Sequence, residues 1–333
     1  MPKVLITGAT GFLGSHLVEL LLERGEDELR VLSTSPPEKL SKKGVELVEG
    51  SITSPEVVAR AVTGIQQIYH LAGKVSRNPD DQREMYELHV DGTRFLCREA
   101  CRAGVERIVL ASSSGTIAVT EDGEKIPDET WPTPLDIISR WSYYTSKVYQ
   151  EQVARQESEG GPELVIVNPS LLLGPGDERL SSTEDILKFL ARAIPATPPG
   201  GLNFVDVRDV APAFVEAMKR GAPGERYLLG GPNWEFAKLF GRLERLTKVA
   251  APRLRLPAPV IEWTSQAVDA LYRHWGKAPP VDRVSVEMSC YFWYLDASKA
   301  KRALGFTSRD PGDTLYETVA YLKEHFLGAG AFR

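Results

Sequence analysis

Three glycines near the start of the chain restrict the possible fold more than any other feature. Gly8, Gly11 and Gly14 follow an apolar run at residues 4–6 and precede a segment whose apolar residues recur at helical spacing. This order predicts a buried strand, a glycine turn and a helix. Gly8 permits a tight turn, Gly11 lets the backbone approach a pyrophosphate, and Gly14 lets the helix pack on the sheet. Free N–H groups at the start of that helix would face the phosphates.

A second motif is Tyr143-x-x-x-Lys147, which occurs once in the chain. Segment 141–153 has few helix breakers, and residues four apart share one face of a helix. A tyrosine needs a lowered pKa to act as an acid or base near neutral pH, because its reference pKa is about 10. A nearby ammonium and an oxidised nicotinamide would lower it. The alternative is a surface tyrosine beside a solvated lysine.

A third element favours the catalytic interpretation. Residues 107–111 form another apolar run, which leads into Ser112, Ser113 and Ser114. In an open parallel sheet, ligands bind outside the carboxyl ends of the strands, where these hydroxyls would lie.

Together, the glycine turn, the serine after a central strand and the Tyr-x-x-x-Lys motif resemble the extended short-chain dehydrogenase/reductase family, which includes NAD-dependent epimerases and dehydratases. The resemblance covers nearly the whole chain, and the dihydroflavonol-reductase-like branch looks most similar. It implies an α/β fold with a doubly wound parallel Rossmann sheet and a smaller, mostly helical C-terminal substrate lobe. The expected NAD(P)-binding domain spans residues 1–173 and is rejoined by 203–230, while 174–202 and 231–333 mainly form the lobe.

The resemblance also implies residue roles. Tyr143 would transfer the proton, Lys147 would bind the nicotinamide ribose and favour tyrosinate, and Ser113 would hold the substrate oxygen. Counting forward from 108–110 selects Ser113, whereas counting back from Thr116 selects Ser114, so both stay open and Ser113 is preferred. The expected cofactor-binding residues lie in the glycine turn, at strand ends and in the Tyr-x-x-x-Lys motif: Gly8, Thr10, Gly11, Phe12, Leu13, Gly14, Ser33, Thr34, Ser51, Ile52, Leu71, Ala72, Gly73, Tyr143, Lys147, Asn168, Pro169 and Ser170.

Three positions depart from the family's pattern. Ser51 stands where an aspartate commonly contacts the adenine amine, and Asn168 stands where arginine is common. His89 replaces the usual asparagine; a histidine still donates and accepts hydrogen bonds, but the role of this position is in doubt. We interpret His70, inside a predicted strand, as a structural residue.

The end of the second predicted strand, residues 29–32, bears on the form of the cofactor. An acidic residue there would bind the ribose hydroxyls of NAD, whereas an arginine would favour the phosphate of NADP. The sequence has the neutral Ser33 and Thr34, with Lys39, Lys42 and Lys43 farther on. Nothing here would repel a phosphate, so we prefer NADP over NAD.

Net charge and composition limit the classes of partner that we expect for this protein. A net charge of −5 and a pI of about 5.7 give no electrostatic footprint for nucleic acid or an anionic membrane. No apolar run approaches the roughly 20 residues of a membrane span, and the three cysteines have no zinc-site spacing, so we expect no metal. Reduced thiols and the lack of a secretory signal fit a cytoplasmic protein with a small-molecule substrate. The family implies a possible homodimer.

The substrate is less constrained. A 4,6-dehydratase needs an acidic pair after the serine strand, and residues 114–117 offer none. A nucleotide-sugar epimerase needs cations for two phosphates, and between Gly174 and Phe204 only Arg179, Lys188 and Arg192 are available. We therefore rank hydride transfer to or from the carbonyl or alcohol of a fairly apolar substrate above epimerisation, and a non-catalytic NAD(P)-binding regulator third.

The last part of the chain gives coarser expectations. Residues 226–229 should be the last strand, and helices should span 236–248 and 260–274. We expect the aromatic cluster Met288, Tyr291, Phe292, Trp293 and Tyr294 to be core rather than pocket lining.

Overall fold

The computed structural model of the 333-residue chain describes residues 2–25, 28–35, 37–257, 260 and 282–328. The helix expected at 260–274 lies, apart from Val260, outside the described residues.

A seven-stranded parallel sheet forms the larger half of the molecule, in the order β3-β2-β1-β4-β5-β6-β9. Its central strands are short apolar runs that are buried on both faces, as the sequence predicts. The strand order reverses between β1 and β4, which is where such sheets bind dinucleotides. The predicted doubly wound α/β fold is confirmed. The strands are β1 (Lys3–Thr7), β2 (Glu28–Ser33), β3 (Glu46–Glu49), β4 (Gln67–His70), β5 (Arg107–Ala111), β6 (Glu163–Pro169) and β9 (Arg226–Leu229).

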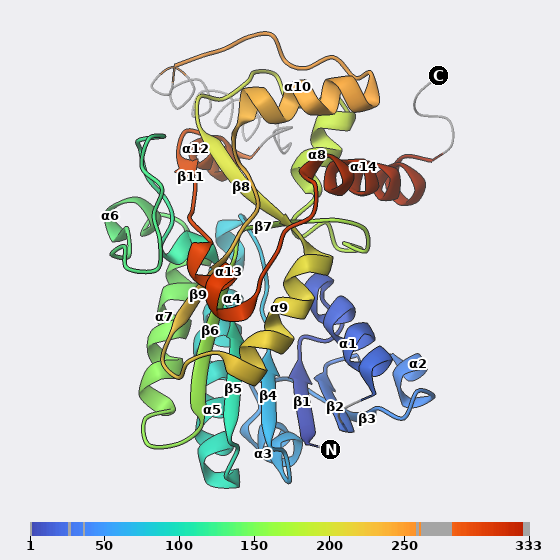
Figure 1. The fold of residues 1–333 in the computed structure, drawn as a ribbon, viewed down its shortest axis with the longest axis vertical. Coiled ribbons are helices and arrows are strands. Elements are labelled where there is room, and N and C mark those ends of the chain that lie inside the picture. The colour runs from blue at the N-terminus through green and yellow to red at the C-terminus, as the bar shows by residue number, and fades with distance from the viewer. Residues whose placement is uncertain (1, 26–27, 36, 258–259, 261–281, 329–333) are drawn as a thin grey trace.

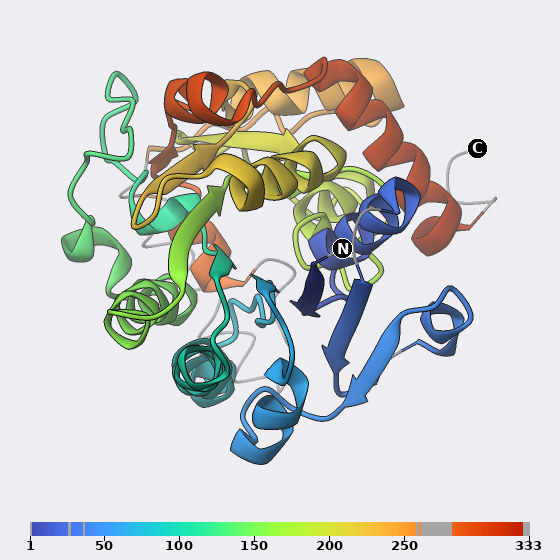
Figure 2. The ribbon, with the colours of Figure 1, turned by 60° about the horizontal axis from the view of Figure 1, so that its bottom comes forward.

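Helices cover both faces of this sheet (Figure 2). On one face, α1 (Phe12–Arg24), α9 (Val207–Arg220) and α13 (Ser298–Leu304) bury their apolar side chains in a common core. On the other face lie α3 (Pro55–Val62), α5 (Gly92–Ala103) and α7 (Ser142–Glu157). The helix expected to carry the Tyr-x-x-x-Lys motif is therefore present as α7.

A smaller lobe stands over the carboxyl ends of the large sheet, at the top of Figure 1. Its central strand β8 (Gly201–Asp206) pairs with β7 (Leu171–Leu173), β10 (Asn233–Glu235) and β11 (Phe292–Trp293). The helices of the lobe are α8 (Glu184–Leu190), α10 (Phe236–Thr247), α12 (Arg283–Met288) and α14 (Pro311–Leu322). The apolar residues of α8, α10 and α14 share a separate core with Phe204 of β8, whereas Val284 and Met288 of α12 pack against another cluster.

Short segments complete the described chain. They are α2 (Glu38–Ser41), 3₁₀ turns at Pro79–Asp81 and Ser114–Thr116, α4 (Gln82–Tyr86), α6 (Leu135–Ile138), and π-type turns at Glu87–Asp91 and Lys323–Leu327.

Several boundaries differ from the expected domains. Residues 203–206 lie in β8 of the small sheet, and the chain returns to the large sheet only with α9. In the C-terminal part, Ala300, Leu304 and Phe306 pack into the core of the large sheet. β9 is the last strand of that sheet, but β10 and β11 follow it in the lobe. Strands of two or three residues are too short for an alternating pattern to reveal them.

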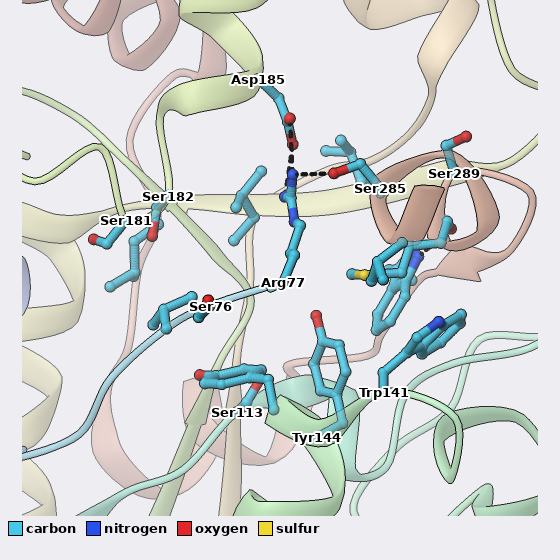
Figure 3. Close-up of a pocket in the computed structure, with 18 of the residues that line it drawn as sticks. Ser76, Arg77, Ser113, Trp141, Tyr144, Ser181, Ser182, Asp185, Ser285 and Ser289 are labelled. Carbon is cyan, nitrogen blue, oxygen red and sulfur yellow. Dashed lines mark hydrogen bonds and ion pairs between the residues drawn. The ribbon is translucent and has the colours of Figure 1, made fainter. Parts of the chain in front are cut away.

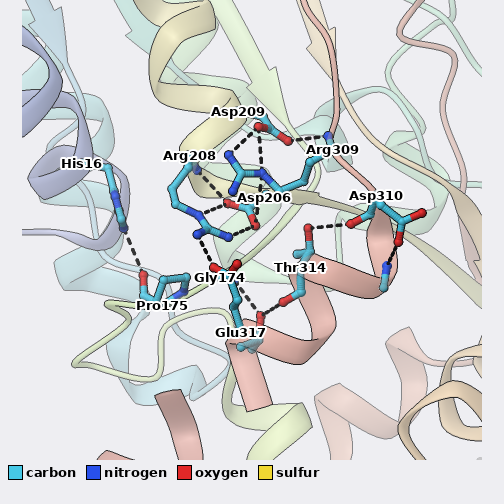
Figure 4. Close-up of polar contacts among 12 residues, drawn as sticks. His16, Gly174, Pro175, Asp206, Arg208, Asp209, Arg309, Asp310, Thr314 and Glu317 are labelled. Carbon is cyan, nitrogen blue, oxygen red and sulfur yellow. Dashed lines mark hydrogen bonds and ion pairs between the residues drawn. The ribbon is translucent and has the colours of Figure 1, made fainter. Parts of the chain in front are cut away.

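Ion pairs join the two halves where β8 runs into α9 (Figure 4). The carboxylate of Asp206 caps α9 by accepting the backbone N–H of Arg208 at 3.0 Å, and it binds the Arg208 guanidinium at 2.7 Å. Arg208 also contacts Glu317 of α14. Arg309 donates to Asp209 at 2.8 Å. The end of the small sheet, α9 and α14 are thereby fixed to one another.

Candidate active site

A cavity of about 1640 Å³ follows the carboxyl ends of β1 to β4. The predicted cofactor residues of the glycine turn and of these strand ends all line it: Gly8, Thr10, Gly11, Phe12, Leu13, Gly14, Ser33, Thr34, Ser51, Ile52, Leu71, Ala72 and Gly73. We call it the nucleotide cavity.

The glycine turn has the geometry that a pyrophosphate requires. Gly8 has a φ of +73°, and a Cβ there would meet the Leu71 carbonyl carbon at 2.5 Å. A Cβ on Gly14 would lie 2.1 Å from the Gly8 oxygen, so close helix packing excludes a side chain. Helix α1 begins after Gly11 without a side-chain cap, which leaves its first N–H groups available to an anion. The Arg179 Nη2 lies 3.5 Å from the Thr10 hydroxyl, so a cation stands beside the turn.

A second cavity of about 650 Å³ adjoins the first, and residues 73–79 line both. Ser113, Tyr143, Lys147, Pro169 and Ser170 line this second cavity, which we call the substrate cavity. The structure therefore brings the three predicted catalytic side chains together beside the nucleotide cavity. Ser113 comes from the segment after β5, and Tyr143 and Lys147 come from α7.

The surroundings of Tyr143 disfavour its charged form. Burial raises the pKa of Tyr143 to about 12, and the nearby Ser113 side chain opposes the shift. The sequence predicts that Lys147 and a bound oxidised nicotinamide would lower this pKa. In the chain itself, the amine of Lys147 is directed to Ala111 and Gln150.

Lys147 is held in a buried position one helical turn from Tyr143. Its Nζ donates to the Ala111 carbonyl at 2.9 Å and to the Gln150 side-chain oxygen at 2.8 Å. Burial lowers the pKa of Lys147 to about 8, and the charge of Glu151 acts in the opposite direction. The amine therefore remains mostly charged at pH 7.

The three serines after β5 have different partners. Ser112 donates its hydroxyl proton to Glu151 Oε1 at 2.5 Å. Ser113 Oγ accepts the Gly115 N–H at 3.3 Å, and its side chain is near enough to Tyr143 to affect the pKa of the phenol. Ser114 lines the substrate cavity as well, but it is not among the groups that shift the pKa of Tyr143. Both serines line the cavity, so the preference for Ser113 stays a prediction.

Behind the serines lies a buried carboxylate that sequence reasoning missed. Glu151 accepts hydrogen bonds from Ser112, from Thr116 Oγ1 at 2.9 Å and from Asn168 Nδ2 at 2.8 Å. The sequence offers one signal for Glu151: it follows Lys147 by four residues and so shares a helix face with it. Asn168, expected to contact the cofactor, is fully buried in this network and lines neither cavity, so it supports the serine loop instead.

Two buried histidines flank the site. His70 bonds to Thr7 and Thr93, each at 2.8 Å, which fits the structural role expected for it. His89 Nδ1 lies 2.8 Å from Ser146 Oγ, its Nε2 accepts the Lys74 N–H at 3.1 Å, and its ring meets the Tyr143 ring edge-on at 5.9 Å. Burial lowers the pKa of both, that of His70 to about 3, so both rings are neutral.

Some groups near Tyr143 have unused bonding capacity. The Ser170 hydroxyl is buried, lines the substrate cavity and has no hydrogen-bond partner among the described residues. An amide such as that of nicotinamide could use it.

From the aromatic cluster expected to be core, Tyr291 and Tyr294 are buried as expected, but Met288 and Trp293 line the substrate cavity. The Trp293 ring lies 4.9 Å from that of Tyr144.

Cations around the substrate cavity are mostly neutralised. Apart from the buried Lys147, only Arg140 lacks an ion pair within the described part of the chain, and it lies about 6.0 Å from the ring of Trp141. The paired ones are Lys74 with Asp81 at 2.9 Å, Arg77 with Asp185 at 2.7 Å, Lys188 with Glu184 at 3.1 Å and Arg283 with Glu287 at 2.7 Å.

Two negative findings concern the described residues. They contain no group of three or more His, Cys, Asp or Glu side chains arranged to hold a metal ion. None of their helices combines the length and the apolar character needed to cross a membrane.

Comparison with known proteins agrees with this geometry. Residues 4–230 match the model of the NAD dependent epimerase/dehydratase family. The chain is 34% identical to a protein named as a dihydroflavonol 4-reductase from Synechocystis sp., over 96% of this chain and 94% of that protein. It is 32% identical to the sterol demethylase protein B of Methylococcus capsulatus, over 96% and 98%. The crystal structure of gox2253 superposes with a TM-score of 0.82 at 32% identity, over 100% of both chains.

Proposed function

The chain belongs to the NAD-dependent epimerase/dehydratase family, and on that premise we propose that it transfers hydride between NADP and the carbonyl or alcohol of a largely apolar small molecule. The family's activity is that of an NAD(P)-dependent oxidoreductase or epimerase. The proposal adds the type of reaction, the form of the cofactor and the class of substrate.

The observation that carries the proposal is that Ser113, Tyr143 and Lys147 line one cavity, which adjoins the nucleotide cavity along residues 73–79. A bound nicotinamide would supply or accept the hydride. In reduction, the Tyr143 hydroxyl gives its proton to the substrate's carbonyl oxygen, and the Ser113 hydroxyl donates to the same oxygen. Lys147, one helical turn from Tyr143 on α7, would bind the nicotinamide ribose.

The residues near the end of β2 support NADP. Ser33, Thr34 and Lys39 all line the nucleotide cavity. Lys39 has no ion-pair partner in the described part of the chain, so its ammonium is available to a phosphate on the adenosine ribose. The end of β2 carries no carboxylate that would repel this phosphate.

The neutralised charges of the substrate cavity support an apolar substrate. A nucleoside diphosphate needs free cations, whereas four of the cavity's cationic side chains already bind carboxylates. The aromatic rings of Trp141, Tyr144 and Trp293 offer flat apolar surface instead. The names of two relatives, a dihydroflavonol reductase and a sterol demethylase protein, both refer to polycyclic molecules.

The first test measures cofactor and substrate together. The pure protein is titrated with NADPH and NADH, and ketones, flavanonols and nucleotide sugars are then screened for a change in NADPH absorbance. We expect tighter binding of NADPH and oxidation of NADPH with neutral ketones. Isomerisation of a nucleotide sugar without net cofactor change would show an epimerase instead, and cofactor binding without any turnover would favour a regulator.

A further inference from the structure

The side chain of Arg77 links the Rossmann domain to the lobe within the substrate cavity (Figure 3). Arg77 lies in the segment after β4 and makes two parallel hydrogen bonds to the carboxylate of Asp185 on α8, at 2.9 and 2.7 Å. Its Nη1 also donates to Ser285 Oγ of α12 at 2.7 Å. In Figure 3, Ser113 and Tyr144 lie on the opposite side of Arg77 from Asp185. A substrate whose oxygen rests on Ser113 would therefore extend toward this ion pair.

Both members of the Arg77–Asp185 pair are charged. Burial alone would raise the pKa of Asp185, but the charge and hydrogen bonds of Arg77, together with Lys188, lower it below its usual range. Burial would likewise lower the pKa of Arg77, and the charge of Asp185 raises it. Both residues line the cavity, where their side chains keep 29% and 40% of their surface accessible. A ligand in the cavity can thus reach the guanidinium.

A guanidinium and a carboxylate fit each other through two parallel hydrogen bonds. Asp185 already occupies that edge of Arg77. A carboxylate on a substrate would have to displace Asp185 and would leave it unpaired beside another anion, which is costly in a confined site. A neutral substrate leaves the pair intact.

We propose that Asp185 is a specificity-determining residue, which neutralises Arg77 so that the cavity accepts uncharged substrates and rejects those bearing a carboxylate. The inference rests on the proposed function only in taking this cavity as the substrate site. Removing the Asp185 carboxylate should convert Arg77 into a binding site for ketones or alcohols that carry an acid group.

The test measures binding, so that it does not depend on turnover. Trp141 and Trp293 line the cavity, and quenching of their fluorescence reports its occupation. The probes are 4-acetylbenzoate and its methyl ester, which differ in one charge at almost the same shape. The ratio of their dissociation constants is compared among the wild type, Asp185→Asn, Asp185→Ser and the double variant Arg77→Gln/Asp185→Asn. Glu184→Gln is the matched control, because it removes a carboxylate on the same helix that pairs with Lys188 and not with Arg77, and Lys188 keeps Asp282 as a partner at 3.6 Å.

We expect the wild type to bind the ester more tightly than the acid. In Asp185→Asn and Asp185→Ser, the ratio should move toward the acid by about tenfold or more, as for a charge-assisted hydrogen bond. The double variant should lose this gain, and Glu184→Gln should keep the wild-type ratio.

An unchanged ratio in both Asp185 variants, folded as judged by circular dichroism, would refute the role of Asp185. A gain that persists in the double variant would also refute it, because Arg77 would not be the group that binds the acid. Failure of the wild type to oxidise NADPH with any ketone would count against the proposed function instead, and it would leave the binding ratios interpretable.

Discussion

Thr7 on β1 and His70 on β4 are joined by a hydrogen bond of 2.8 Å where the two strands leave the sheet. The Thr7 oxygen also accepts the Ala72 N–H at 3.1 Å, and the other ring nitrogen of His70 lies 2.8 Å from Thr93 Oγ1. A neutral imidazole accepts at one ring nitrogen and donates at the other, so both ring nitrogens of His70 have partners. Gln150 then links Thr93 to Lys147, so Thr7 in the nucleotide cavity is connected to α7.

This network should make the protein sensitive to acid. Burial lowers the pKa of His70 to about 3 from an ordinary value of 6.5, so between these values the unfolded chain binds a proton that the folded protein does not. Stability must therefore fall as the pH is lowered through this window. Between pH 6.5 and 4.5 we expect His70 to account for about 2–3 kcal/mol of the loss in unfolding free energy.

Urea unfolding at several pH values measures this contribution. His70→Gln should be less stable than the wild type at pH 7, but its stability should fall less steeply toward pH 4.5. His16→Gln, which changes a histidine outside the network, is the control. Equal slopes for the wild type and His70→Gln would contradict the assignment.

Replacing Tyr143 by phenylalanine should reduce kcat by about a hundred- to ten-thousand-fold, the usual contribution of a general acid. The affinity for NADPH should change little, because the variant removes only the phenol oxygen. Stopped-flow kinetics and a fluorescence titration measure the two quantities. Tyr149→Phe, an exposed tyrosine on the same helix, is the matched control and should behave as the wild type. Retained turnover in Tyr143→Phe would make that residue a bystander.

Ser113 and Ser114 can be separated by their alanine variants. Loss of the Ser113 hydroxyl removes a donor to the reacting oxygen and should lower kcat by about a hundredfold. Loss of the Ser114 hydroxyl should change KM more than kcat, because this residue lines the cavity without contributing to the pKa of Tyr143. The reverse order of effects in steady-state kinetics would transfer the role to Ser114.

Lys39→Ala tests the preference for NADP. Removing one charge-assisted contact to a phosphate should raise the dissociation constant of NADPH by about tenfold and leave that of NADH nearly unchanged. Lys42→Ala is the matched control, since Lys42 is exposed and does not line the nucleotide cavity. Calorimetric titration gives both constants. Equal losses for the two cofactors would show that Lys39 does not contact the phosphate.

Local sequence patterns were sufficient to predict the elements of the first half of the molecule. The apolar run 4–6, the glycines and the helical spacing after them report directly on one strand, one turn and one helix, and the structure has all three. Tyr143 and Lys147 share a helix face for the same reason, because their relation is fixed by a spacing of four residues.

Contacts between distant segments could not be read in this way. Arg77 and Asp185 are 108 residues apart, and only the folding of the lobe over the sheet brings them together. The Tyr143-x-x-x-Lys147 motif likewise does not show where the Lys147 amine is directed, because that depends on Ala111 and Gln150. The place of Asn168 behind the serines likewise depends on Glu151, a residue of another element.

The direct passage of β8 into α9 has a practical consequence. One continuous stretch of backbone belongs first to the lobe and then to the layer that covers the Rossmann sheet, and the salt links of Asp206 and Arg208 clamp this crossover. A chain divided after residue 173 would separate α9, β9 and α13 from the other strands of the large sheet, to which they belong. Workers who wish to swap substrate lobes between relatives should exchange loops and keep this crossover whole.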